Sequence, residues 1–178
     1  MKRTLLLTFA ALVLTASAGH GQMKVQFDLG GGISEPTGDY GDFTDLGWHG
    51  LATVAVVPNG SPLAIQVTGF YSQLDFKTIG GRWELGGGFG ELRLDLLKRS
   101  KMTGSVLLGG GVIHAKAKPD VGGSTSDTRG AFDGGLGLTY NVTEMVGFFF
   151  QARYVNIFID GPDITMIPLT AGLRFHFR

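Results

Sequence analysis

The chain has 178 residues, no cysteine, and equal numbers of basic and acidic side chains, 15 of each. The lack of cysteine excludes a disulfide framework and thiolate chemistry. The balanced charge gives no indication of a nucleic-acid partner.

The first 18 residues are typical of an export signal. Lys2 and Arg3 form a basic start, residues 5–15 are largely apolar, and Ala16-Ser17-Ala18 is a small-x-small cleavage site. The apolar segment is shorter than the roughly 20 residues that a membrane-spanning helix needs, so cleavage near Ala18 is preferred to an uncleaved anchor. We therefore expect a signal peptide over residues 1–18 and one domain over residues 19–178.

The rest of the chain alternates apolar and polar residues with the two-residue period of β-strands. The clearest example places Leu92, Leu94 and Leu96 on one face. Glu91, Arg93 and Asp95 alternate with these leucines and fall on the opposite face. In chain order, strands are expected at about 23–33, 46–57, 63–74, 83–96, 102–114, 129–140, 145–158 and 163–178. No apolar run in this part is long enough for a spanning helix, although the mean hydropathy is positive. A membrane protein of this kind has to be a closed barrel, because only helices and barrels satisfy their backbone groups in lipid.

The expected connections alternate between longer and shorter segments. The longer ones are 34–45, 75–82, 115–128 and 159–163, and tight turns at 58–62, 97–101 and 141–144 lie between them. Transmembrane barrels of bacteria have this asymmetry, with short periplasmic turns and longer external loops. We predict an all-β fold, an eight-stranded antiparallel up-and-down transmembrane β-barrel.

The last strand carries a second pattern. Thr170, Gly172, Phe175 and Phe177 fit a polar-x-Gly-x-x-aromatic-x-aromatic sequence. It resembles the terminal signal by which bacterial outer-membrane barrels are recognised for insertion. Together with the export signal, the strand rhythm and residues 167–175, it makes the chain similar to the small eight-stranded outer-membrane barrel family that includes OmpX and the membrane domain of OmpA.

The resemblance implies a cellular setting. It places the protein in the outer membrane of a Gram-negative cell envelope, with both termini periplasmic. The implied partners are outer-membrane lipid and lipopolysaccharide, and the barrel assembly machinery during biogenesis. No domain follows the last strand here, so we do not expect the cell-wall tethering that OmpA proteins achieve with their additional domain.

The same alternation could also describe a soluble, lipocalin-like barrel with its apolar face inward. The charged face of the strands is rich in glycine, which suits a narrow lumen, whereas large leucine and phenylalanine side chains suit lipid. Aromatic residues near strand ends are interpreted as interfacial girdles: Trp48, Tyr71, Trp83, Tyr140, Phe148, Phe158, Phe175 and Phe177. These features favour the membrane barrel.

The inward charges are expected to pair, because they cannot remain unpaired in a space closed to water. Strand directions place Asp133 and Arg153 at similar depth on neighbouring strands, so we predict that they meet. We also predict that Arg174 reaches across the lumen towards the charges of the fourth strand: Glu91, Arg93 and Asp95.

The favoured function is a non-catalytic envelope protein, a rigid barrel that presents external loops for structure or adhesion. No motif indicates which external ligand the loops meet, and none indicates a cofactor. Gly86 to Gly90 lacks the Gly-Lys-Ser/Thr continuation of a phosphate loop, and His49 and His176 are too far apart for shared metal binding.

Two alternatives stay open. A lipid A-modifying enzyme would need a serine, a histidine and a carboxylate at the outer rim. His114, Ser124, Ser126 and Asp127 supply these groups, but without a known spacing. A narrow, porin-like pore is the other alternative, although the interior of eight strands is only wide enough for its own side chains.

Overall fold

The computed structural model describes residues 23–77, 80–120, 122–158 and 164–177. The predicted signal peptide, residues 1–18, lies outside the described residues, as does the connection 159–163. The elements are β1 (Met23–Thr37), α2 (Asp39–Phe43), β2 (Gly47–Pro58), β3 (Leu63–Asp75), β4 (Gly81–Arg99), β5 (Met102–Pro119), β6 (Thr125–Asn141), β7 (Val146–Ile157) and β8 (Ile164–Phe177).

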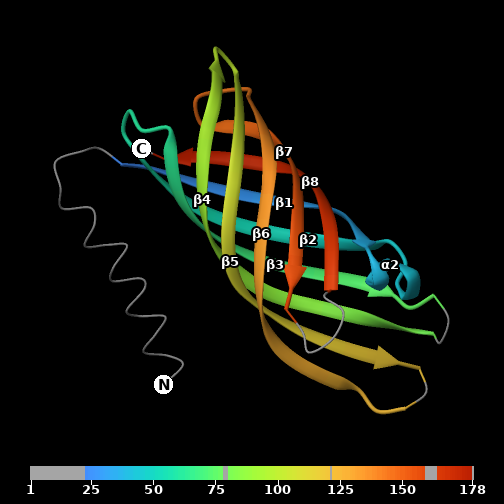
Figure 1. The fold of residues 1–178 in the computed structure, drawn as a ribbon. Coiled ribbons are helices and arrows are strands. Elements are labelled where there is room, and N and C mark those ends of the chain that lie inside the picture. Colours follow the sequence, from blue (N-terminus) through green and yellow to red (C-terminus); the bar gives the residue numbers. More distant parts are fainter. Residues whose placement is uncertain (1–22, 78–79, 121, 159–163, 178) are drawn as a thin grey trace.

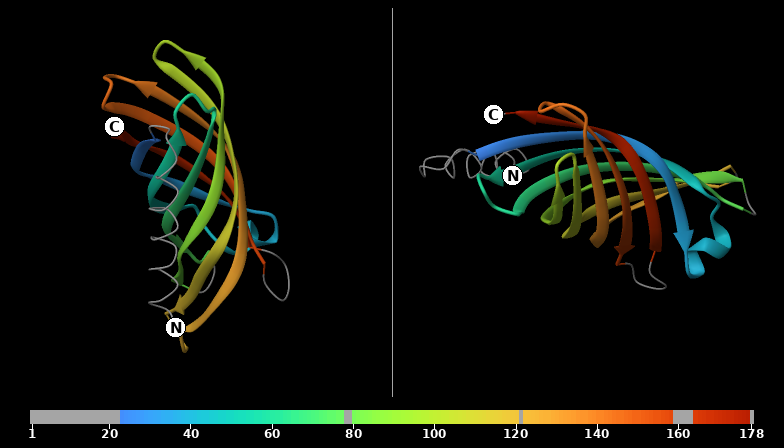
Figure 2. Two further views of the ribbon diagram at one scale, coloured as in Figure 1. Left: turned by 90° about the vertical axis from the view of Figure 1, so that its left-hand side faces the viewer. Right: turned by 90° about the horizontal axis from the view of Figure 1, so that it is seen from above.

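The eight strands form one closed barrel (Figures 1 and 2). Each strand pairs antiparallel with its neighbours in the sequence, and β1 also pairs with β8, which closes the sheet. This closure pairs the first and last strands, which would otherwise be the edges of the sheet. The predicted eight-stranded, antiparallel up-and-down barrel is confirmed.

The barrel has two different ends. Both terminal strands have their chain ends at the same end of the barrel, which also carries the connections 59–62, 100–101 and 142–145 (Figure 1). We call this the turn end. The opposite end, which we call the loop end, carries α2 and the connections between β3 and β4, β5 and β6, and β7 and β8. Among the described residues, no helix is long and apolar enough to cross a membrane.

The expected long loop at 115–128 is mostly strand. β5 continues to Pro119 and β6 begins at Thr125, and the ladder between them still pairs Ala117 with Thr125. The alternation of alanine and lysine at residues 115–118 is a strand pattern, and the glycine-rich segment after it obscured this pattern in the sequence. As a result β5 and β6 have 18 and 17 residues. β4 is also long, with 19 residues, whereas β2 and β7 have 12 each.

The outer face of the barrel is apolar, as predicted from the strand alternation. Its exposed side chains include Leu29, Ile65, Leu92, Leu108, Leu136 and Phe150. Aromatic rings lie on the same face, and the rings of Trp48 and Tyr71 are 5.7 Å apart. Trp83 does not belong to this girdle, and its prediction was wrong. It shares the inward parity of Leu85 on β4, packs against the buried core, and its ring lies 6.2 Å from that of Tyr40.

The core lies inside the barrel, in the half next to the loop end. Its fully buried members include Leu85, Phe89, Ile113, Ile157 and Met166. Tyr40 from α2 belongs to the same cluster and covers it at the loop end. Burial raises the pKa of the Tyr40 hydroxyl well above its ordinary value, so the phenol stays neutral there. Charged and small residues were expected along the whole lumen, but in this half large apolar side chains fill most of the interior, beside buried polar residues such as Ser34 and Ser72.

Candidate functional site

A buried cluster of three charged side chains lies at the centre of the lumen. Nη1 of Arg153 donates to Oε1 of Glu91 at 2.7 Å and to Oδ2 of Asp133 at 2.9 Å, and Nη2 donates to Oε2 of Glu91 at 3.0 Å. None of the three side chains is more than 1% exposed. Gln66 and Thr68 also donate to Oε2 of Glu91. The structure thus brings the predicted partners Asp133 and Arg153 together, and adds Glu91 to them.

Strand register explains why Glu91 joins this cluster. Glu91 pairs with Gly109 on β5, and Gly109 pairs with Asp133 on β6, so the three residues form one row. A Cβ atom on Gly109 would lie 2.5 Å from Cγ of Glu91 and 2.8 Å from Oδ1 of Asp133. Glycine is therefore required between the two carboxylates. Two carboxylates share one guanidinium, and Oδ1 of Asp133 is buried without a hydrogen-bond partner.

Arg174 is located elsewhere than predicted. Its Nε and Nη2 donate to the two carboxylate oxygens of Asp28, each at 2.7 Å, and Nη1 donates to Thr139 at 2.9 Å. Asp28 lies directly opposite Arg174 in the ladder between β1 and β8. The pairing of Arg174 with β4 was predicted only from the similar depth of these residues in the barrel. The register of the closing ladder was the signal that could have identified Asp28.

Arg93 forms the third group, nearer the turn end. It is fully buried, with Nε 3.1 Å from Oδ1 of Asp95 and Nη2 2.6 Å from Oε1 of Gln26. Nη1 of Arg93 reaches Oε1 of Gln66 at 3.3 Å, and Gln66 also binds Glu91. Arg93 is thereby linked to the central cluster. The predicted lumen residues of β4 form a network with Arg153 and Gln26 instead of with Arg174.

A buried histidine lies between the polar centre and the apolar core. Nδ1 of His49 is 3.1 Å from Oγ of Ser34, and its Nε2 is 2.8 Å from Oγ1 of Thr170. Its ring stacks on Phe70 at 5.5 Å. His49 is 2% exposed, so these contacts hold the lumen together and reach no open surface. Sequence reasoning missed this group, because only the register shows which hydroxyls face the ring.

The residues of the predicted insertion signal face both sides of β8. Thr170 points inward to His49, and Gly172 makes room for the ring of Phe149, which a Cβ atom there would approach to 2.7 Å. Phe175 lies 6.4 Å from the ring of Phe27, and Phe177 is exposed. Their role in insertion stays a prediction.

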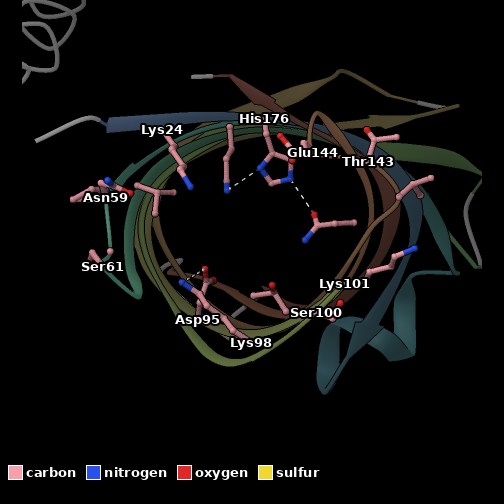
Figure 3. Close-up of a pocket in the computed structure, with 17 residues that line it drawn as sticks. Lys24, Asn59, Ser61, Asp95, Lys98, Ser100, Lys101, Thr143, Glu144 and His176 are labelled. Carbon is pink, nitrogen blue, oxygen red and sulfur yellow. Dashed lines mark hydrogen bonds and ion pairs between the residues drawn. The ribbon is translucent and has the colours of Figure 1, made fainter.

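A polar cavity of about 790 Å³ opens at the turn end (Figure 3). Its wall is formed by the turn-end residues of β1, β2, β4, β5, β6 and β8 and by the three tight connections. Figure 3 shows its side chains arranged around an open centre, with Lys24 and Lys101 on opposite sides. His176 lines the wall and is bonded to Gln26 and Asn141. Sequence reasoning did not predict this cavity, because its residues come from segments that are far apart in the chain.

The groups considered for catalysis do not converge. Nδ1 of His114 contacts Oγ1 of Thr128 at 2.9 Å, opposite it in the ladder. Asp127 pairs with Ala115, one position along, so its side chain lies on the other face of the hairpin, and it binds Arg129. The described part of the chain contains no group of three or more potential metal ligands. The geometry that the Ser-His-carboxylate hypothesis needs is therefore absent from the contacts of His114 and Asp127.

Comparison with known proteins gives the family and the fold. The profile of the family described as outer membrane protein beta-barrel domain matches residues 5–177. Neisserial surface protein A has a similar structure, with a TM-score of 0.67 and 17% identity, over 87% of this chain and 97% of that one. The N-terminal β-barrel domain of Pseudomonas aeruginosa OprF has a TM-score of 0.56 and 13% identity, over 89% of this chain and 100% of that one. Ail is the attachment invasion locus protein of Yersinia pestis, and its structure was solved with the heparin analogue sucrose octasulfate. It has a TM-score of 0.54 and 18% identity, over 87% of this chain and 99% of that one. No match was found among curated protein sequences.

Proposed function

Because this chain belongs to the family of outer-membrane protein β-barrel domains, we propose that it is a non-catalytic envelope barrel with a closed lumen. Its task is to present the loop end outside the cell, for structure or adhesion. The observation that carries this proposal is the filling of the lumen. Apolar side chains occupy the loop-end half, and paired charges occupy the centre.

The contacts inside the lumen support a closed barrel over a pore. Leu85, Ile113 and Met166 have no exposed surface, although they come from three different strands, so the side chains meet across the interior. The arginine at the centre is fixed by two carboxylates and cannot swing aside without leaving them unpaired. Eight-stranded barrels have interiors of this size, filled by their own side chains.

The proposed orientation places the turn end in the periplasm and the loop end outside. Two features support this orientation. The connections at the turn end are short, and the loop end carries α2 and the extended ends of β4, β5 and β6. Lipopolysaccharide and other outer-membrane lipid then surround the apolar outer face, and both termini are periplasmic. The barrel assembly machinery is the proposed partner during biogenesis.

The extended hairpin of β5 and β6 is the part that we propose for adhesion. It carries the exposed polar residues Ser126, Asp127 and Thr128 and reaches beyond the shorter strands. Ail, which has the same fold at 18% identity, carries an attachment function in its name and was solved with a sulfated ligand. A sulfated glycan is accordingly a reasonable first ligand to test.

The test is the triple substitution Ser126→Ala, Asp127→Ala and Thr128→Ala in the exposed part of the hairpin. We expect the variant to be inserted and to retain heat-modifiable migration on a gel, because the barrel below the hairpin is unchanged. Attachment of producing cells to immobilised heparin should fall to the level of cells without the protein. Unchanged attachment would contradict the role of the hairpin.

Lipid analysis separates the proposal from the enzyme alternative. Cells with and without the protein should contain lipid A with the same acyl chains, by mass spectrometry. A change in acyl pattern that disappears in a His114→Ala variant would replace the proposal by lipid A chemistry.

Insertion is tested separately at the closing strand. With both Phe175→Ala and Phe177→Ala, we expect the protein to be exported, cleaved near Ala18, and then degraded without folding. The matched control is Phe148→Ala with Phe150→Ala, which removes two exposed rings from β7 and leaves β8 intact. Normal barrel levels in the β8 variant would contradict the insertion signal.

A further inference from the structure

The turn-end cavity has the features of a binding site for an anionic ligand. It is a concave space of about 790 Å³, more than twenty times the roughly 30 Å³ that one water molecule occupies in the liquid. Lys24, Lys98 and Lys101 line it and come from three places in the chain. The barrel closure brings them around one opening (Figure 3).

The charge of this region is positive on balance. Asp95 and Glu144 are the acidic residues of the cavity wall. The carboxylate of Asp95 is already bound by the buried guanidinium of Arg93 at 3.1 Å, whereas its distance to Nζ of Lys98 is 3.8 Å. Because the carboxylate of Asp95 is already paired with the guanidinium of Arg93, it does not fully neutralise the lysines at the opening.

The deeper groups keep that charge in place. Below the cavity Arg174 is paired with Asp28, and Arg93 is paired with Asp95. The floor is therefore a set of bonded, rigid groups, and the lysines above it project from the rim. A fixed positive region of this kind attracts anions from solution.

The neutral part of the wall suits a peptide or a sugar. Hydroxyl and amide side chains complete it: Asn59, Ser61, Ser100, Thr103, Asn141 and Thr143. These groups both donate and accept hydrogen bonds. Large apolar side chains are few in the wall, with Val57 and Val142 among them. A lipid tail would find little to bind here.

From this geometry we propose that the turn-end cavity binds the peptide stem of the periplasmic cell wall, through its free carboxylates. The inference rests on the proposed orientation, which makes the cavity open to the periplasm. The lysines hold the carboxylates, and the hydroxyl and amide groups bind the peptide backbone. The barrel would then contact the cell wall directly.

The experiment uses the folded barrel in detergent micelles and a disaccharide-tetrapeptide fragment released from cell wall by muramidase. Binding is measured by isothermal titration calorimetry. The test variant is Lys24→Gln, Lys98→Gln and Lys101→Gln together. The matched control is Lys77→Gln, Lys116→Gln and Lys118→Gln, which removes the same charge from the loop end.

We expect the wild type and the control variant to bind equally, and the test variant to bind roughly tenfold more weakly, since three exposed ion pairs are lost. Binding should also weaken as salt is raised, because exposed charges are screened. The gel shift on heating shows whether each variant is folded. A folded test variant that binds like the wild type would overturn the proposal, as would a wild type that does not bind.

Two further probes separate the wall peptide from other ligands. The same fragment with its carboxylates amidated should lose binding, and equal binding would overturn the role of charge. Inorganic phosphate that displaces the fragment at equal concentration would show a general anion site and overturn the peptide assignment. If the barrel proves to be non-conducting and correctly oriented while the fragment does not bind it, that result would overturn this inference alone and leave the proposed function in place.

Discussion

The two halves of the lumen are stabilised by different interactions. At the loop end Leu85, Ile113 and Met166 pack without any exposed surface. In the other half Asp28, Arg93 and Arg174 are buried as deeply, but each is held by charge-assisted hydrogen bonds. The apolar half depends on shape and volume, whereas the polar half depends on every partner being present.

This difference has a consequence for function. The apolar core excludes water and ions even when its side chains shift slightly, because apolar surface cannot replace the hydrogen bonds that water gives an ion. A polar network alone could rearrange and admit ions. The loop-end half therefore closes the barrel, and the turn-end half shapes a polar surface that is open at the cavity.

The largest expected effect comes from a charge placed in the apolar half. Ile113→Asp has no partner there, and its cost should be on the order of 5 kcal/mol, enough to prevent stable folding. Thr139→Asp is the matched control in the polar half, because Nη1 of Arg174 already donates to Oγ1 of Thr139 at 2.9 Å and can donate to a carboxylate there. Urea titration in lipid vesicles measures both. Equal losses would show that the two halves do not differ.

The next effect is at the centre of the lumen. Arg153→Ala leaves the two buried carboxylates of Glu91 and Asp133 without their guanidinium and should cost about 3 to 5 kcal/mol of unfolding free energy. Apolar replacement of Asp133 and Arg153 together should remain costly, since Glu91 is still unpaired. Replacing all three by apolar residues should recover most of the loss. A triple variant that is no more stable than Arg153→Ala would contradict the shared pairing.

This central cluster also marks how far the sequence could predict the site. Alternation along each strand identifies which residues face inward, and neighbouring strands bring Asp133 to Arg153. Contacts across the barrel depend on the register of all eight strands, which a shift of one residue would change completely. For that reason the sequence missed both the contact of Glu91 with Arg153 and the pairing of Arg174 with Asp28.

The apolar plug was not predicted for a related reason. Residues such as Leu85, Phe89 and Ile113 were assigned to neither face, because a barrel strand that is apolar on both faces has no alternation to follow. The number of strands, in contrast, followed from strand spacing and connection lengths, and closure followed from the need to satisfy backbone groups in lipid.

A smaller effect is expected at the pair of Arg174 and Asp28. Arg174→Lys keeps the charge but loses the two parallel hydrogen bonds to the carboxylate, each 2.7 Å long. We expect a loss of about 1 to 3 kcal/mol, because lysine acts as a point charge and cannot reproduce this geometry. The measurement is the same urea titration, with Lys24→Arg at the rim as a control that should change little.

The smallest effect is predicted for Asp133→Asn. Oδ1 of Asp133 has no hydrogen-bond partner, and its carboxylate shares one arginine with Glu91. Asparagine still accepts from Arg153 and removes one of two like charges, so stability should change by less than about 1 kcal/mol or increase. Asp28→Asn, whose carboxylate is fully bonded, should lose more. A larger loss of stability for Asp133→Asn than for Asp28→Asn would contradict the proposed excess of negative charge at the centre of the lumen.

The closed lumen is tested most directly by single-channel recording across a planar lipid bilayer. The wild-type barrel should give no stable conductance step. A variant that removes the plug, with Leu85→Gly, Phe89→Gly and Ile113→Gly together, provides the comparison and should conduct if it folds. A steady, voltage-independent conductance of the wild type would contradict the account, because it requires a continuous polar path through the loop-end half.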